Sequence, residues 1–128
     1  MYQQDWISRQ IQTLVHFIAR VIFKKDNIEY RIFDPYDLTE ADRLYYEIGR
    51  LTEEFKICEA ENLLFEKIDA HDDNYLKLAV DFYQKVNALS DKELKDADFS
   101  RDEIQSGLVD IMRMFGLPAI PLGETRDE

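Results

Sequence analysis

The chain has few of the residues that interrupt helices or cross-link small folds. Its 128 residues include one cysteine, three prolines and four glycines, and two of the prolines lie in the last eleven positions. A single cysteine excludes an internal disulfide framework and a cysteine-rich zinc site. So few glycines and prolines favour long helices over a β-sandwich with many turns. The chain also lacks a signal peptide and an apolar run near the roughly 18 residues of a membrane span, so we expect a soluble, cytoplasmic protein.

Positive charge is also scarce. The chain has 16 basic and 27 acidic residues, for a net charge of −11. Such an excess of negative charge repels a phosphate backbone, so we do not expect nucleic acid to be the partner. Residues 1–25 are the exception, because they hold four basic residues against one acidic residue. We expect this basic segment to lie against the acidic remainder of the chain.

Apolar residues, which make up 45% of the chain, recur at the spacing of amphipathic helices. The recurrence predicts helices over residues 3–24, 39–51, 52–69, 75–89, 91–97 and 101–115. Capping-box pairs mark three of the starts: Thr39 with Asp42, Ser90 with Glu93, and Ser100 with Glu103. We therefore predict an all-α fold, a compact bundle of five or six helices formed by a single domain over residues 1–117. Residues 118–128 are expected to be a disordered C-terminal tail.

The stretch from 52 to 89 is expected to organise the bundle. It is predicted to form two antiparallel helices joined by the acidic turn 70–74. Their apolar stripes must cover each other or a third element between them, and the other helices would pack on this hairpin. The apolar stripes before and after Thr52 are out of phase, so the helical region 39–69 should break near that residue. Thr52 is a candidate cap for the new helix, and Cys58, on the apolar stripe, is expected to be buried.

The helix over residues 3–24 has an apolar arc that covers about half of its surface. An arc this wide predicts a helix that contacts at least two others. The opposite strip contains Arg9, His16 and Arg20. The alternative is attachment to a membrane surface through this helix, which is disfavoured because the acidic remainder would be repelled by anionic lipid. After this helix, one short alternating segment has no strand to pair with, so we expect an ordered connector whose Tyr30, Phe33 and Tyr36 fill gaps between helices.

Small and apolar residues between positions 48 and 68 resemble the second half of a tetratricopeptide repeat. They are Ile48, Gly49, Ala60, Leu64, Phe65 and Ile68. The resemblance covers about one repeat of the thirty-odd-residue period and lacks the tryptophan, the closing proline and a second copy. It implies a tetratricopeptide-repeat-like helical hairpin and, by analogy, protein binding.

Two short runs give a second resemblance. The opening run at positions 4–7 (QDWI) and the run at 98–101 (DFSR) are similar to those of a small bacterial, all-helical family of unknown function. This resemblance covers most of the chain. It implies no activity.

We find no pattern typical of a catalytic or metal centre. Neither His16 nor His71 has the glutamate three residues before it that a di-metal bundle requires, and no glycine-rich phosphate loop occurs. We therefore predict no cofactor, no metal and no enzyme activity. One sector is unusual, since Arg50, Glu54 and Glu61 share a helical face with apolar residues. They form either structural ion pairs, with Arg50 on Glu54 and Glu61 exposed or paired with an arginine of the first helix, or a polar ligand or general-base pocket.

The expected function is non-catalytic protein–protein interaction, adaptor-like, with an unidentified protein or a second copy of the chain. Tyrosine is well suited to interfaces because its ring buries a large area at low entropic cost. The candidate partner-binding residues are Tyr45, Tyr46, Arg9, His16 and Arg20, and Tyr36 is a further surface candidate. The alternatives are a small-ligand binder or enzyme that uses the Arg50, Glu54 and Glu61 sector, and membrane-surface attachment.

Overall fold

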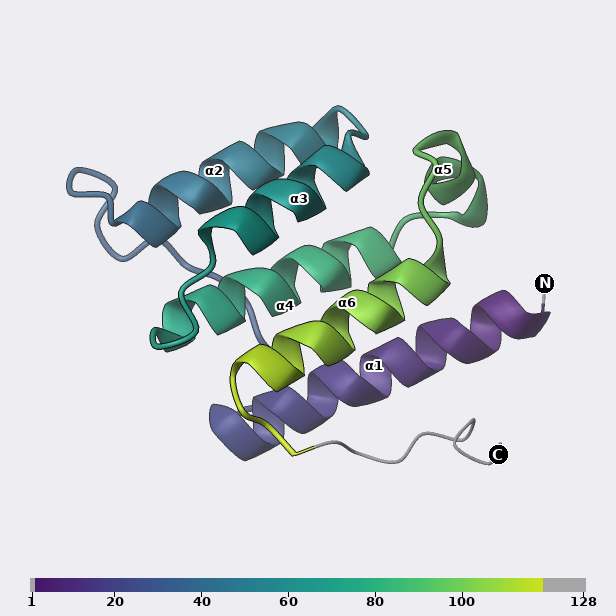
Figure 1. The fold of residues 1–128 in the computed structure, drawn as a ribbon, viewed down its shortest axis with the longest axis horizontal. Coiled ribbons are helices and arrows are strands. Elements are labelled where there is room, and N and C mark those ends of the chain that lie inside the picture. Colours follow the sequence, from purple (N-terminus) through teal and green to yellow (C-terminus); the bar gives the residue numbers. More distant parts are fainter. Residues whose placement is uncertain (1, 119–128) are drawn as a thin grey trace.

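A computed structural model describes residues 2–118, so most of the tail predicted over 118–128 lies outside the described residues. Six α-helices occur in this part of the chain, and it contains no strand (Figure 1). They are α1 (Tyr2–Ile22), α2 (Glu40–Glu53), α3 (Ile57–Lys67), α4 (Asp73–Asn87), α5 (Asp91–Asp96) and α6 (Arg101–Met114). The prediction of an all-α bundle of five or six helices is confirmed.

Side-chain hydrogen bonds cap the N-termini of four of the helices. Thr39, Ser90 and Ser100 each form the predicted capping box at the starts of α2, α5 and α6. Asp72 caps α4 by accepting from the backbone N–H of Asn74 at 2.9 Å. Each cap satisfies backbone donors that the first turn of a helix leaves without a partner. These boundaries therefore follow from short sequence motifs.

The predicted break after α2 is confirmed, but Thr52 is not a cap. α2 ends at Glu53 and α3 begins at Ile57, with Phe55 between them in the left-handed region at φ 60°. The Thr52 hydroxyl donates to the carbonyl of Ile48 at 2.7 Å, one turn earlier in α2. Lys56 occupies the N-cap position of α3 and makes no side-chain capping bond. The change of apolar phase therefore located the break correctly, although the capping residue was predicted wrongly.

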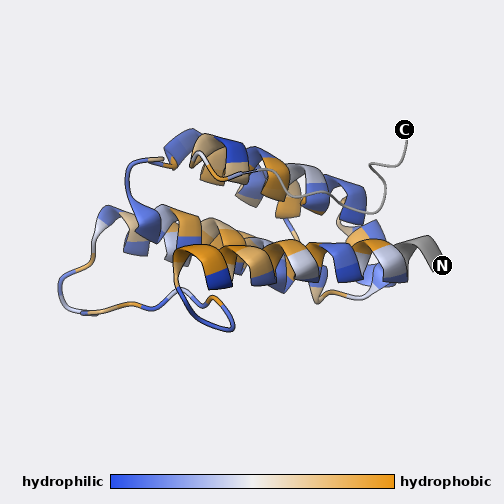
Figure 2. Ribbon diagram, turned by 90° about the horizontal axis from the view of Figure 1, so that it is seen from below, coloured by the Kyte–Doolittle hydropathy of each residue, from blue (hydrophilic) through white to orange (hydrophobic). Residues whose placement is uncertain are grey.

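α4 is the central helix of the fold. It packs against α1, α2 and α6, whereas α3 packs mainly against α2 (Figure 1). Of the two arrangements expected for the hairpin over residues 52–89, the structure shows the second, because α3 and α4 are not each other's main neighbours and both pack against a third helix, α2. The short α2–α3 connection instead places those two helices side by side. Seen edge-on, the helices form two layers, with the connector 23–39 on the outside (Figure 2).

α1 lies with its apolar arc in the core, as the width of that arc predicted. Ile11 and Ile18 are completely buried, and Leu14 is nearly so. The helix ends earlier than expected, at Ile22, and Lys24 takes the left-handed conformation that follows it, at φ 56°. Most of this arc contacts α4 and α6, whereas Trp6 and Val21 of the same arc are exposed. No helix in the described part of the chain has the length and apolar character required to cross a membrane.

A close contact between α4 and α6 explains why position 107 is a glycine. A Cβ atom at Gly107 of α6 would overlap the hydroxyl and ring of Tyr83, which is completely buried on α4. The partner in that contact, a tyrosine that carries a buried hydroxyl, is decided by the packing.

Candidate functional site

The structure does not bring the three residues of the predicted polar sector together. Arg50 pairs with Glu54 at the end of α2, at 3.5 Å and with both side chains exposed. Glu61 lies on α3 and accepts a hydrogen bond of 2.6 Å from the Tyr83 hydroxyl. The structural interpretation is confirmed for Arg50 and Glu54. For Glu61 the expected arginine partner on α1 is wrong, because the carboxylate points toward α4.

Glu61 is half-buried and lies near other carboxylates. Burial raises the pKa of the Glu61 carboxyl, and Glu103 and Asp110 raise it further, whereas the hydrogen bond from Tyr83 acts in the opposite direction. The carboxylate is therefore held by one neutral donor in acidic surroundings. The hydrogen bond to Glu61 gives the buried Tyr83 hydroxyl a partner. It does not place a serine, cysteine or threonine nucleophile beside a general base. Within the described residues, no group of three or more histidine, cysteine, aspartate or glutamate side chains is placed to hold a metal ion.

Cys58 is exposed, although the apolar stripe of α3 predicted that it would be buried. Its thiol donates to the carbonyl of Asp98 at 3.7 Å. Partial burial of the thiol and the nearby carboxylates of Glu103 and Asp98 raise its pKa. A raised pKa lowers the thiolate fraction, so this position is not an activated nucleophile.

Tyr45, a predicted partner-binding residue, belongs to a cluster that fixes the connector to the bundle. Its ring stacks on Tyr30 with centroids 4.8 Å apart, and its hydroxyl accepts from Lys85 of α4 at 3.1 Å. The Tyr30 hydroxyl donates to Asp42 at 2.6 Å, while Lys85 also pairs with the buried Asp81 at 2.9 Å. Burial and the adjacent Asp42 raise the pKa of Tyr30. Tyr45 is therefore half-buried and engaged within the fold, whereas Tyr46 is exposed.

Beyond Tyr30 the connector forms a turn, here called the aromatic turn (residues 33–37). Phe33 is 99% exposed and Tyr36 is 96% exposed, so the prediction that they fill gaps between helices is wrong. The Asp34 carboxylate accepts from the backbone N–H of Tyr36 at 3.0 Å, and the Asp34 carbonyl accepts from the N–H of Asp37 at 3.1 Å. These two bonds and Pro35, whose ring fixes its φ angle, give the turn a defined conformation. Tyr30 fills the space between α2 and α4, and both later rings remain in solvent.

The basic strip of α1 is uncovered. Arg9, His16 and Arg20 are all exposed, and Arg20 pairs only with Asp26 just beyond the same helix, at 3.3 Å. We expected this segment to lie with its charges against the acidic remainder. The apolar arc of α1 makes that contact instead, because burying apolar area stabilises the fold more than an exposed ion pair does.

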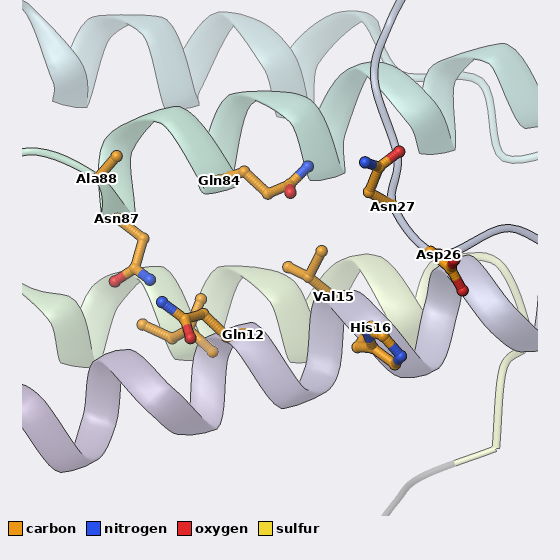
Figure 3. Close-up of a pocket in the computed structure, with 9 residues that line it drawn as sticks. Gln12, Val15, His16, Asp26, Asn27, Gln84, Asn87 and Ala88 are labelled. Carbon is orange, nitrogen blue, oxygen red and sulfur yellow. The ribbon is translucent and has the colours of Figure 1, made fainter.

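A groove of about 240 Å³ runs between α1 and α4 beside this strip (Figure 3). Gln12, Val15 and His16 of α1 face Gln84 and Asn87 of α4 across it (Figure 3). Some of its polar groups are already engaged, since the Gln84 amide donates to the Ile28 carbonyl at 2.7 Å and the Asn87 amide donates to the Ser8 carbonyl at 3.3 Å. Part of the hydrogen-bonding capacity of the groove lining is therefore already used within the fold. The volume suits one side chain better than a large ligand.

The sequence matches the model of a family of unknown function, DUF6483, over residues 1–116. The chain belongs to this family. The match covers all six helices, and it agrees with the resemblance seen in the runs at positions 4–7 and 98–101. No curated protein and no solved structure matches the chain.

Sequence reasoning named Tyr36 as a surface candidate, but it missed the turn that exposes this ring together with that of Phe33. The aromatic turn contains the sequence FDPYD, in which an aspartate precedes a proline. Asp-Pro favours turn initiation, and this signal could have identified a surface turn. The exposure of the two rings depends on which of the connector's aromatic residues enters the core, and that cannot be determined from local sequence.

Proposed function

We propose that the chain is a non-catalytic, adaptor-like protein-interaction module whose aromatic turn binds a protein partner. The observation that carries the proposal is the almost complete exposure of Phe33 and Tyr36 on a hydrogen-bonded turn. Burying one such ring on a partner contributes about 1.5–3 kcal/mol. Because the turn is ordered before binding, little conformational entropy is lost when the partner docks.

The charges around the turn indicate the kind of partner surface that fits it. Asp34 and Asp37 lie on either side of Pro35 and Tyr36, within a chain of net charge −11. A partner with an apolar recess and a basic rim would be complementary, since opposite potentials steer association and exclude wrong partners. Tyr46, exposed on α2, is a second anchor candidate. The resemblance of residues 48–68 to a tetratricopeptide repeat supports protein binding by analogy alone.

A pull-down with a double variant tests the proposal. The intact chain, F33S/Y36S and the control variant M114S would be used as baits in lysate of the source cells. Met114 is an exposed apolar residue on α6, outside the turn. We expect a protein that the intact chain and M114S retain and that F33S/Y36S loses. Equal retention by all three baits would contradict the role of the turn.

A second copy of the chain is a possible partner that the same variants can test. Light scattering of the intact chain and of F33S/Y36S would show whether a dimer forms and whether it depends on the two rings. A monomer in scattering together with only non-specific proteins in the pull-down would overturn the proposed function. Unchanged melting temperatures of the variants would show that the loss is not due to unfolding, as expected for residues this exposed.

A further inference from the structure

A surface hollow lies where the end of α1, the connector and the first turn of α4 meet. Its volume is about 400 Å³. It is here called the basic hollow, and its principal lining residues are Phe23, Lys25, Asn27, Arg31, Asn74 and Lys77. It has three cationic side chains and one carboxylate, Glu29, in a chain that carries 27 acidic and 16 basic residues. The local charge is therefore opposite in sign to that of the whole protein.

The cations of the basic hollow are poorly neutralised. Arg31 pairs with Glu29 at 3.4 Å, with both side chains largely exposed, so this pair contributes little to stability. The Lys77 ammonium lies over the ring of Phe23, 5.2 Å from its centroid, and Lys25 makes no side-chain hydrogen bond or ion pair with any described residue. Other lysines of the chain do have carboxylate partners, as Lys85 does with Asp81. Two ammonium groups at one hollow are thus available to an anion.

We infer that the basic hollow binds a small molecule that carries a phosphate group. Two ammonium groups without a carboxylate partner match the charge of a phosphate dianion, and the Arg31 guanidinium adds donors of the geometry that phosphate oxygens accept. The amide groups of Asn27 and Asn74 are further donors at the same opening. The Phe23 ring forms an apolar wall for the rest of the molecule. The volume lies within the range of small-ligand sites, which runs from about 300 to 1,000 Å³.

This site is independent of the aromatic turn, because none of its lining residues belongs to residues 33–37. The negative charge of the rest of the protein opposes an anion, but exposed charges more than about 8–10 Å away are largely screened at physiological salt. Two carboxylates adjoin lining residues in the sequence: Asp26 is paired with Arg20, and Asp73 lies in the first turn of α4. The attraction for an anion therefore comes from the three lining cations. Binding should weaken steeply as salt concentration rises, because both ammonium groups are reached from solvent.

The test is a titration of the isotope-labelled intact chain with inorganic pyrophosphate, followed by amide chemical shifts at constant ionic strength. We expect saturable shifts confined to residues 23–31 and 74–77, with a dissociation constant of about 1 mM or tighter. K25Q/K77Q should weaken binding about tenfold, since each exposed charge contributes a few-fold. K95Q, which removes an exposed lysine on α5, should bind as the intact chain does.

Two outcomes would overturn the inference. The first is the absence of saturable shifts at these residues, or shifts that K25Q/K77Q leaves unchanged. The second is tighter binding of citrate than of pyrophosphate, which would assign the hollow to carboxylates instead of phosphate. A conserved pattern of amide shifts outside the hollow would show that K25Q/K77Q is folded, so that its loss of binding is local.

Discussion

Replacing Arg101 with methionine should destabilise the fold strongly. Arg101 is the first residue of α6, yet its side chain is only 7% exposed. The guanidinium donates to the carbonyls of Leu89 at 2.7 Å and Asn87 at 3.2 Å, which follow or end α4. It also donates to the Asn87 side chain at 3.2 Å and to Asp91 of α5 at 2.7 Å. One side chain therefore joins the end of α4 to the starts of α5 and α6.

The magnitude follows from the groups that R101M would leave without a donor. Each buried polar group that loses its partner costs about 1–3 kcal/mol, and more when the lost partner is charged. The Asn87 and Leu89 carbonyls both lose a charged donor, while the 54% exposed Asp91 can be rehydrated. We expect a loss of about 3–4 kcal/mol, from two buried carbonyl groups that each lose a charged donor. For a domain of this length the loss corresponds to a fall in melting temperature of about 10–15 °C.

Urea unfolding followed by circular dichroism would measure this loss for R101M. D91N is the matched control, because it removes only the more exposed partner and should cost less than about 1 kcal/mol. The loss for R101K should fall between those of R101M and D91N. Lysine keeps the charge, but its single ammonium nitrogen cannot reach all the acceptors that the planar guanidinium contacts. A loss below about 1 kcal/mol for R101M, or an equal loss for D91N, would refute the assignment of Arg101 as the link between the three helices.

Two further predictions concern the contact of α3 and α6 with Tyr83. Because the pKa of Glu61 is raised in the fold, its protonated form favours folding, and that stabilisation is lost as pH rises through the folded pKa. E61Q should therefore be at least as stable as the intact chain at pH 7, with an advantage that shrinks toward pH 4 in urea titrations; an advantage that grew with acidity would contradict the raised pKa. G107A should lose about 1–3 kcal/mol in thermal melts through overlap with Tyr83, whereas G49A, which meets open space, should gain about 0.5–1 kcal/mol. Equal shifts for the two glycine variants would exclude the overlap.

Much of the secondary structure could be predicted because its causes are local. A capping box such as Ser90 with Glu93 joins groups three residues apart, so its effect is present in any fold that allows the helix. The helical period of apolar residues likewise specified which face of α1 would be buried. The stop after α6 is of the same kind, since Gly116 takes the left-handed conformation at φ 70° and the N–H of Leu117 bonds the Met112 carbonyl at 2.9 Å.

The three residues of the polar sector are separated for a different reason. Arg50, Glu54 and Glu61 share a sector on a continuous helical wheel, but the break at Phe55 turns α3 relative to α2. Glu61 then meets Tyr83, which lies 22 residues later in the chain. A helical wheel has no information about a partner on another helix, so the pairing could not be deduced from spacing.

The sequence by itself determined where most helices start and end and that their apolar faces form one core, because capping and periodicity act over a few residues. Only the tertiary structure decided that α4 is central, that Tyr30 enters the core while Phe33 and Tyr36 remain in solvent, and that Lys25 and Lys77 meet at one hollow. These outcomes depend on contacts such as that of Tyr30 with Asp81, which join positions 51 residues apart. Contacts of this range form together as the core packs, and the competition among side chains for the same space selects which of them are buried.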